Sequence, residues 1–230
     1  MATEVLNFEL TQRGTVVGVH ALRTERRGGT VHMLGRLRLE GALGRSTITQ
    51  QSRAHVRQYH SLHFREEQQK RGDNRTFDLQ FDRASGLVKV TATGSPAAEQ
   101  PLIRPYRDPL AMLTEIRQLP ADAQHMTIPM LGKDVQVSLL TTVTLETPVG
   151  PRAARVYRLF PGGSLLWIGE EEPHLILKMQ QRIHGSPVEV VLTGVASEAG
   201  STRESGRKSP QRDGRRSRSR RGRRRRRRQD

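Results

Sequence analysis

The sequence Arg107-Asp-Pro-Leu-Ala-Met-Leu-Thr-Glu-Ile-Arg-Gln-Leu119 predicts one amphipathic helix in a chain whose other patterns are typical of strands. Asp108 suits the N-cap, because its carboxylate can accept hydrogen bonds from the free amides of the first turn. Pro109 fits the first helical position, and Pro120 ends the helix. Spacing of three and four residues predicts one buried stripe, made of Leu110, Leu113, Ile116 and Arg117. A single helix among many strands is expected to cover the open side of a curved sheet.

Alternating apolar residues predict strands throughout the first hundred residues, each with one buried face. Two features stay open: Gly35 suggests a bend or bulge inside its strand, and residues 50–60 could form a helix instead of strands. Residues 94–100 are expected to form a loop. The predicted strands are Leu6–Leu10, Thr15–Arg23 (with Val17, Val19 and Ala21 inward), Val31–Leu43, Thr47–Arg53, Val56–Glu67, and the hairpin of Phe77–Phe81 with Val88–Ala92.

The alternation resumes after Pro120 and predicts a second group of strands. Short turns join them, which antiparallel sheets allow and parallel sheets do not. These strands are Val135–Leu145, Ala153–Phe160, Ser164–Ile168, Leu175–Met179 and Val188–Leu192. The alternation ends at Val195, and no apolar residue follows Ala199.

Together these patterns predict a mainly β protein. Its fold class is a single curved antiparallel sheet, an incomplete barrel, with one plugging helix around residues 108–119. A chain of 230 residues is long enough for one sizeable core. We predict a β half-barrel domain at residues 1–195. Residues 196–230 should form a disordered, basic, Arg-rich C-terminal tail, because they have almost no apolar surface to bury against the entropy of ordering.

The positive charge is concentrated in the tail. The chain has a formal net charge of +16, and residues 201–230 hold 15 Lys/Arg against 3 Asp/Glu, which is +12. The first 200 residues hold 24 basic and 20 acidic groups, which is only +4. The sequence therefore predicts a nearly neutral domain with a cationic arm.

Composition also limits the compartment and the chemistry. The chain has no cysteine, hence no disulfide and no cysteine-ligated zinc. The first ten residues lack both a basic segment and a continuous apolar run, so they do not resemble a signal peptide. No window approaches the roughly 18–20 apolar residues of a membrane-spanning helix. We therefore expect a cytoplasmic protein without a transmembrane segment.

Several segments carry a resemblance to a known family: Phe77–Phe81, Asp108–Arg117, Glu146–Gly150, Leu166–Ile168 and Pro173–Val191. Their order resembles an uncharacterised family of bacterial envelope proteins related to the lipoprotein-carrier (LolA-like) incomplete β-barrels, over roughly residues 5–195. The resemblance implies a strongly curved antiparallel sheet with a helix over its concave side, sometimes leaving an apolar cavity. It also implies a periplasmic location. The chain departs from the family in lacking an export signal and in carrying the Arg-rich tail.

No group of residues predicts an active site or a metal site. His60 and His63 could share a metal on a helix, but on the predicted strand residues three apart face opposite sides. Glu170-Glu-Glu172 lies in a turn and lacks the further acidic residues of a calcium loop. A phosphate-binding glycine loop and a nucleophile elbow are both missing. We predict a protein that is not an enzyme, with no catalytic residues, no metal and no cofactor.

The tail provides the predicted binding residues. Runs of like charge are typical of arms that bind polyanions, and the arginine fork matches phosphate. Nucleic acid, RNA or DNA, is the expected partner; a solubilising extension and an anionic membrane surface are the alternatives. The predicted polyanion-binding residues are Arg215, Arg216, Arg218, Arg220, Arg221, Arg223, Arg224, Arg225, Arg226, Arg227 and Arg228.

Two functions follow from the sequence. The first is a non-enzymatic binding or accessory protein, whose tail tethers the half-barrel to nucleic acid or another polyanion. The alternative is a carrier or sensor that holds an apolar, lipid-like small ligand in the concave face of the sheet.

Overall fold

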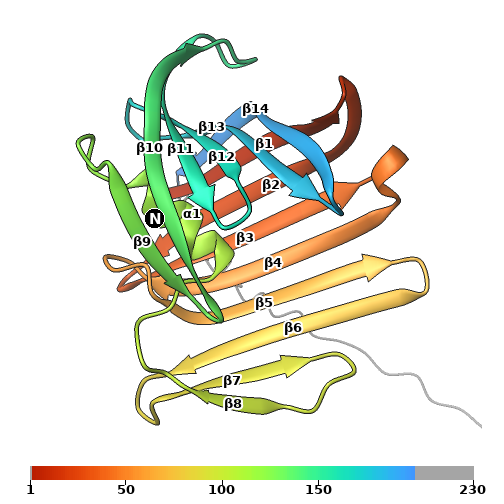
Figure 1. Ribbon diagram of the computed structural model, residues 1–230, viewed down its shortest axis with the longest axis vertical. Helices are drawn as coiled ribbons and strands as arrows, with labels where there is room; N and C mark the ends of the chain where they lie inside the picture. The colour runs from red at the N-terminus through yellow and green to blue at the C-terminus, as the bar shows by residue number, and fades with distance from the viewer. Residues whose placement is uncertain (1, 200–230) are drawn as a thin grey trace, which may run out of the picture. The chain divides into compact units, whose positions relative to one another are not determined.

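The structure is a computed structural model that describes residues 2–199. This part of the chain forms fourteen strands, one α-helix and one short 3-10 helix (Figure 1). In chain order the elements are β1 (Ala2–Gln12), β2 (Thr15–Arg27), β3 (Thr30–Leu39), η1 (Gly41–Leu43), β4 (Ser46–His55), β5 (Ser61–Lys70), β6 (Asp73–Asp82), β7 (Leu87–Ala92), β8 (Ala98–Pro101), α1 (Pro109–Arg117), β9 (His125–Met130), β10 (Lys133–Leu145), β11 (Arg152–Phe160), β12 (Ser164–Gly169), β13 (Ile176–Ile183) and β14 (Ser186–Ala199). The predicted tail from residue 200 onward lies outside the described residues.

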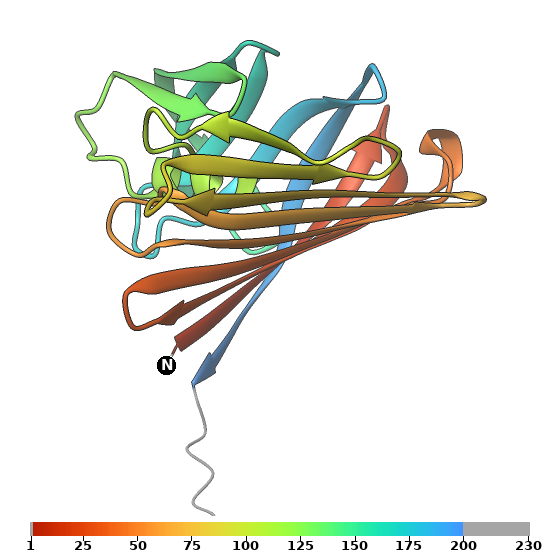
Figure 2. The same ribbon diagram turned by 90° about the horizontal axis from the view of Figure 1, so that it is seen from below.

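All the strands of this part form one antiparallel sheet. Its order is β8-β7-β6-β5-β4-β3-β2-β1-β14-β13-β12-β11-β10-β9. Strands that are neighbours in this sheet are also consecutive in the chain, except in the middle, where β1 pairs with β14 and joins the two halves. Figure 2 shows these two strands side by side, with both described ends of the chain at the same end of the sheet. β8 and β9 are left as edges, so the sheet is not closed, and the predicted fold class is confirmed.

The helix was predicted in the right place, but it is more deeply buried than one stripe would require. Asp108 is the N-cap and Pro109 the first helical residue, as expected. Figure 1 shows α1 inside the curve of the sheet, with β10 on one side of it and β2–β4 on the other. Because protein surrounds it, residues off the predicted stripe are buried too: Ala111, Met112, Thr114 and Glu115. Leu113, which belongs to the stripe, is only partly buried.

Ile116 and Leu113 should therefore differ in their contributions to stability. Ile116 has no exposed surface, so Ile116→Ala is expected to lower the free energy of unfolding by about 2–5 kcal/mol, through lost burial and an unfilled cavity. Leu113→Ala should cost less, because part of that side chain has no protein neighbour to lose. Denaturant melts of both variants measure the two losses. A loss at Ile116 below about 0.5 kcal/mol, the level of surface substitutions, would place α1 in solvent.

The inward face of β2 differs from the prediction. Val17 and Gly18 are both buried, and the alternation then continues through His20 and Leu22 rather than through Val19. Val19 is 49% exposed. The reason is a register shift between β1 and β2 at this position, which reverses the parity of the residues that follow. His20 is thereby turned toward the inside of the sheet.

The bulge suggested at Gly35 is not formed. β3 pairs with both neighbours through Gly35 without a register shift. The glycine instead leaves room for the helix and for polar side chains. A Cβ at this position would lie 3.4 Å from three atoms, which are Leu110 Cδ2, His20 Nε2 and Gln50 Oε1.

Other differences concern the limits of strands. Residues 50–60 form the end of β4 and a turn, not a helix, and β5 begins at Ser61 rather than Val56. Residues 98–100, predicted as loop, belong to the edge strand β8, and β9 was not predicted. β14 continues to Ala199, four residues past the end of the alternation, because main-chain pairing with β1 does not require apolar side chains. The predicted start of the tail at residue 196 is therefore too early.

The segment before α1 connects the two halves of the sheet at one point. The Tyr106 carbonyl accepts a hydrogen bond of 2.9 Å from the Ser61 amide at the start of β5. The Arg107 amide donates a bond of 2.8 Å to the Pro129 carbonyl of β9. Two successive residues thus bridge β5 and β9 just before the helix begins, which fixes where α1 enters the concave side.

Candidate functional site

The concave side of the sheet contains a cavity of about 260 Å³ beside α1. Twelve of its lining residues are apolar: Leu10, Leu37, Ile48, Pro109, Leu110, Met112, Leu113, Leu159, Leu165, Leu166, Met179 and Val190. The other six are His20, Gln50, Glu66, Ser164, Gln180 and Gln181. An apolar lining with a few polar groups is typical of small-molecule sites, although this volume is slightly below their usual range of roughly 300–1,000 Å³.

Strand alternation builds the two walls of this cavity. In the first half of the sheet, His20, Leu37 and Ile48 are cross-strand partners, so their side chains form one row. In the second half and across the central pair, a matching row consists of Leu166, Met179, Val190 and Leu10. Residues of α1 close the space between the rows. The cavity therefore depends on the curvature of the sheet and on the position of the helix.

Three polar residues stand together in one wall. Gln50 Nε2 donates a hydrogen bond of 2.7 Å to Glu66 Oε2 across β4 and β5. The His20 ring stacks on Phe8, with 5.7 Å between the ring centroids. Part of the His20 ring faces the cavity, while burial lowers its pKa to about 4. The imidazole is therefore neutral at pH 7. Sequence alternation missed these residues because polar side chains at inward positions interrupt the pattern.

The N-cap of α1 fixes the helix to the sheet. Asp108 is 2% exposed, and its Oδ1 accepts hydrogen bonds from the amides of Leu110 and Ala111 at 2.9 and 3.0 Å. Its Oδ2 accepts bonds from the hydroxyls of Ser52 and Ser61 at 2.7 and 2.5 Å. Burial raises the pKa of Asp108, and these hydrogen bonds oppose the rise. All the contacts of this carboxylate hold the helix, so its role is structural.

The other end of α1 is held by an ion pair. Arg117 donates to both carboxylate oxygens of Glu4 in β1, at 2.6 and 2.8 Å. The same guanidinium donates to the carbonyls of Pro173 and His174, at 2.9 and 2.8 Å. Arg117 thus ties the helix to the middle of the sheet and to the loop before β13.

The clustered histidines lie apart from this cavity. The rings of His55 and His60 stack with 4.9 Å between their centroids, and burial lowers the pKa of His60 to about 4. His63 Nε2 lies 3.0 Å from Asp78 Oδ2. Within residues 2–199, no group of three or more His, Cys, Asp or Glu side chains is placed to hold a metal ion. No described helix has the length and apolar character needed to cross a membrane.

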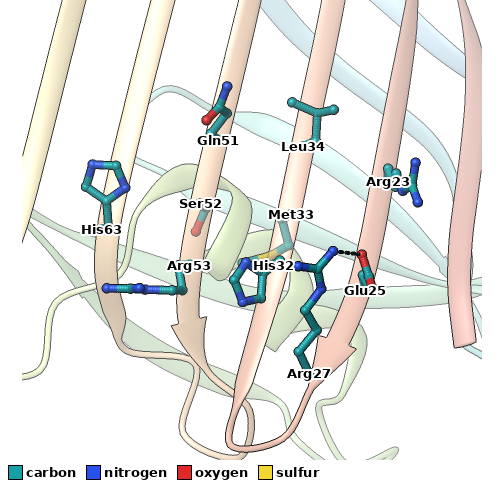
Figure 3. Close-up of a pocket in the computed structure, with 10 residues that line it drawn as sticks. All are labelled: Arg23, Glu25, Arg27, His32, Met33, Leu34, Gln51, Ser52, Arg53 and His63. Atoms are coloured by element: carbon teal, nitrogen blue, oxygen red, sulfur yellow. Dashed lines mark hydrogen bonds and ion pairs between the residues drawn. The ribbon is translucent and has the colours of Figure 1, made fainter. Parts of the chain in front are cut away.

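The outer face of β2–β5 contains a second, wider groove of about 560 Å³ (Figure 3). Arg27 Nη2 lies 2.7 Å from Glu25 Oε2, and His32 and Arg53 are successive cross-strand partners of Glu25. Burial and the neighbouring guanidinium groups of Arg27 and Arg53 lower the pKa of His32. Alternation places six arginines and two glutamates on this face: Arg23, Arg27, Arg36, Arg38, Arg53, Arg65, Glu25 and Glu67.

This face concentrates positive charge that the sequence alone did not locate. The total charge of the first 200 residues is only +4, which suggested an almost neutral surface. The predicted polyanion-binding residues, Arg215–Arg228, lie outside the described residues.

Of the comparisons with known proteins, the one with solved structures gives a match. Among solved structures, a β-barrel-like protein of the domain of unknown function DUF1849 from Brucella abortus is similar, with a TM-score of 0.53 and 8% sequence identity. The similarity covers 86% of this chain and 98% of that one. Neither protein-family models nor curated protein sequences give a match. At this identity the likeness shows the fold alone, which is β-barrel-like. The relation to lipoprotein carriers stays a prediction.

Proposed function

We propose that this protein is a non-enzymatic binding protein that holds a small apolar ligand in the cavity beside α1. The observation that carries the proposal is the cavity itself, about 260 Å³ lined mainly by Leu, Ile, Met and Val side chains. Protein interiors are close-packed, with few voids larger than a water molecule. An engineered apolar cavity of about 150 Å³ already binds benzene. A space of this size and lining suits an alkyl chain or an aromatic group.

Alkyl ligands should reveal the size of the site. Each buried methylene contributes about 0.8 kcal/mol, which is roughly a fourfold gain in affinity per methylene. In a series of straight-chain alcohols, affinity should rise with length and then level off once the cavity is full. A continued rise with length would indicate binding to a surface rather than to an enclosed space.

A fluorescent probe tests the location of the site. N-phenylnaphthylamine should bind the protein with increased fluorescence, and Leu113→Trp should abolish this binding by filling the cavity from α1. Leu140→Trp is the matched control, because Leu140 is 52% exposed on β10 and does not line the cavity. Circular dichroism confirms that both variants fold. Equal probe binding by Leu113→Trp and Leu140→Trp would move the site elsewhere.

A second candidate function is attachment to nucleic acid. It is favoured by the charge of +12 in residues 201–230 and by the arginines on the outer face of β2–β5. The two functions use different parts of the chain, so one does not exclude the other. A polyanion would bind through the tail, while the concave side would still hold an apolar ligand.

A further inference from the structure

We infer that the cavity selects ligands whose polar end donates a hydrogen bond, such as an alkyl alcohol or alkylamine, over ligands that end in a carboxylate. The inference rests on the proposed function, since it specifies the ligand of the same cavity. It follows from the polar corner formed by His20, Gln50 and Glu66, which brings the Gln50 Oε1 acceptor and the Glu66 carboxylate to the cavity and contributes no cation.

Two side chains of this corner, His20 and Gln50, converge over Gly35, and the third, Glu66, is bonded to Gln50. His20 Nε2 and Gln50 Oε1 each lie 3.4 Å from the point that a Cβ on Gly35 would occupy. Gln50 and Glu66 are direct cross-strand partners. The missing side chain of Gly35 therefore leaves a small space between polar atoms, in a wall that is otherwise apolar.

The hydrogen bonding of Gln50 makes this corner an acceptor. Its Nε2 donates to Glu66 Oε2, because the opposite orientation of the amide would place two acceptors together. Gln50 Oε1 then faces the space over Gly35, and no residue in the described part of the chain donates to it. A ligand hydroxyl or amine can donate to this oxygen, whereas a carboxylate cannot.

The charges around the cavity act in the same direction. Glu66 is the only acidic residue in the lining, and no described arginine or lysine lines the cavity. His20 offers no positive charge at pH 7, since burial keeps its pKa near 4. A ligand carboxylate would lie beside Glu66 in apolar surroundings without a cation, which is costly. An alcohol brings no charge, and an ammonium group would pair with Glu66.

Displacement of bound N-phenylnaphthylamine from the full chain tests the inference. The competitors are decanol, decylamine and decanoate, which share one chain length. At pH 7, decanol and decylamine should displace the probe at concentrations about tenfold lower than decanoate does, the factor expected from one lost hydrogen bond. Glu66→Gln should bring decanoate closer to decanol, and Glu67→Gln should not. Glu67 is the matched control because it lies next in β5, on the outer face, where it pairs with Arg65.

The deciding quantity compares two proteins: the ratio of the displacing concentrations of decanoate and decanol in the wild type, divided by the same ratio in Glu66→Gln. Differences in solubility among the competitors cancel in this quotient. A quotient of one, in a protein that binds the probe, would overturn this inference. The proposed binding of apolar ligands in the cavity would still hold. Absence of probe binding would instead overturn the proposed function. If Glu66→Gln does not fold, Gly35→Ala serves in its place. Its Cβ, at 3.4 Å from both polar atoms, should weaken the binding of decanol and decylamine more than that of decanoate. Equal weakening of the binding of all three would also contradict the inference.

Discussion

A chain that ends at Gly200 is expected to lose most of its affinity for a fluorescent oligonucleotide. The removed segment holds +12 of the total charge of +16. A polycationic segment binds phosphates mainly through counterion release, so the affinity of the full chain should depend steeply on salt. Contact with about 6–10 phosphates would lower that affinity by about 10³–10⁵ between 50 and 200 mM salt. Sequence preference should be weak, because phosphate contacts do not distinguish bases.

A salt titration by fluorescence anisotropy, with the full and the shortened chain, measures both effects. Circular dichroism of the shortened chain is the control, and it should retain a strand-dominated spectrum with a thermal transition. If the shortened chain binds as tightly as the full one, the tail is not the binding site. The outer face of β2–β5 would then be the next candidate, tested by Arg36→Gln with Arg53→Gln in the shortened chain. Failure of both chains to bind at low salt would leave only the apolar-ligand function.

The parts of the fold that the sequence predicts are those with local causes. Asp108 and Pro109 define the start of α1 by capping chemistry that needs no other part of the chain. Alternation predicts β1, β3 and the strands from β10 to β14, because each has one buried face. The fold class follows from these elements together, since many short-turn strands and one helix leave few other arrangements.

The features that the sequence does not predict depend on long-range pairing. The inward position of His20 results from a register shift between β1 and β2, which no local pattern reveals. β8 has four residues, all of them exposed, so its backbone pairing alone defines it. In β9, Met126, Ile128 and Met130 alternate, but the strand has only six residues and contains Pro129, which counts against a strand. Gly35 illustrates the ambiguity of glycine in a strand: a bulge and a close contact have the same sequence signal, and here the close contact is the correct one.

The candidate site also contains residues that the sequence predicts and residues that it does not. Leu110 was predicted to face the sheet, and it does line the cavity. Gln50 lies where a helix over residues 50–60 was the competing prediction, and Glu66 lies in the predicted strand Val56–Glu67. Their convergence requires both the correct strands and the correct register, so the polar corner was beyond reach of the sequence. The Arg-rich tail is the opposite case: its composition indicates the binding of polyanions, but it predicts no folded structure.

Replacing Glu4 by Ala is expected to destabilise the protein by about 3 kcal/mol, the lower end of the cost of removing one partner of a buried ion pair, because 22% of the Glu4 side chain is exposed. Only 6% of the Arg117 side chain is exposed, so water can replace the lost carboxylate only in part. The remaining partners of Arg117 are the carbonyls of Pro173 and His174, which are neutral and leave the guanidinium charge uncompensated. The substitution should also loosen α1, because this pair connects the helix to β1.

Glu9→Ala is the matched control for this prediction. Glu9 lies in the same strand, but it is exposed and the opposite parity turns it away from the core. Its replacement should change the free energy of unfolding by no more than about 0.5 kcal/mol, as at other surface positions. Urea melts of Glu4→Ala and Glu9→Ala give both values.

The alternation of Leu6, Phe8 and Leu10 places Glu4 on the inner face, and an acidic residue there needs a cation. Equal, small losses for both variants would show that Arg117 remains hydrated, and that α1 is fixed by Asp108 and its apolar contacts instead.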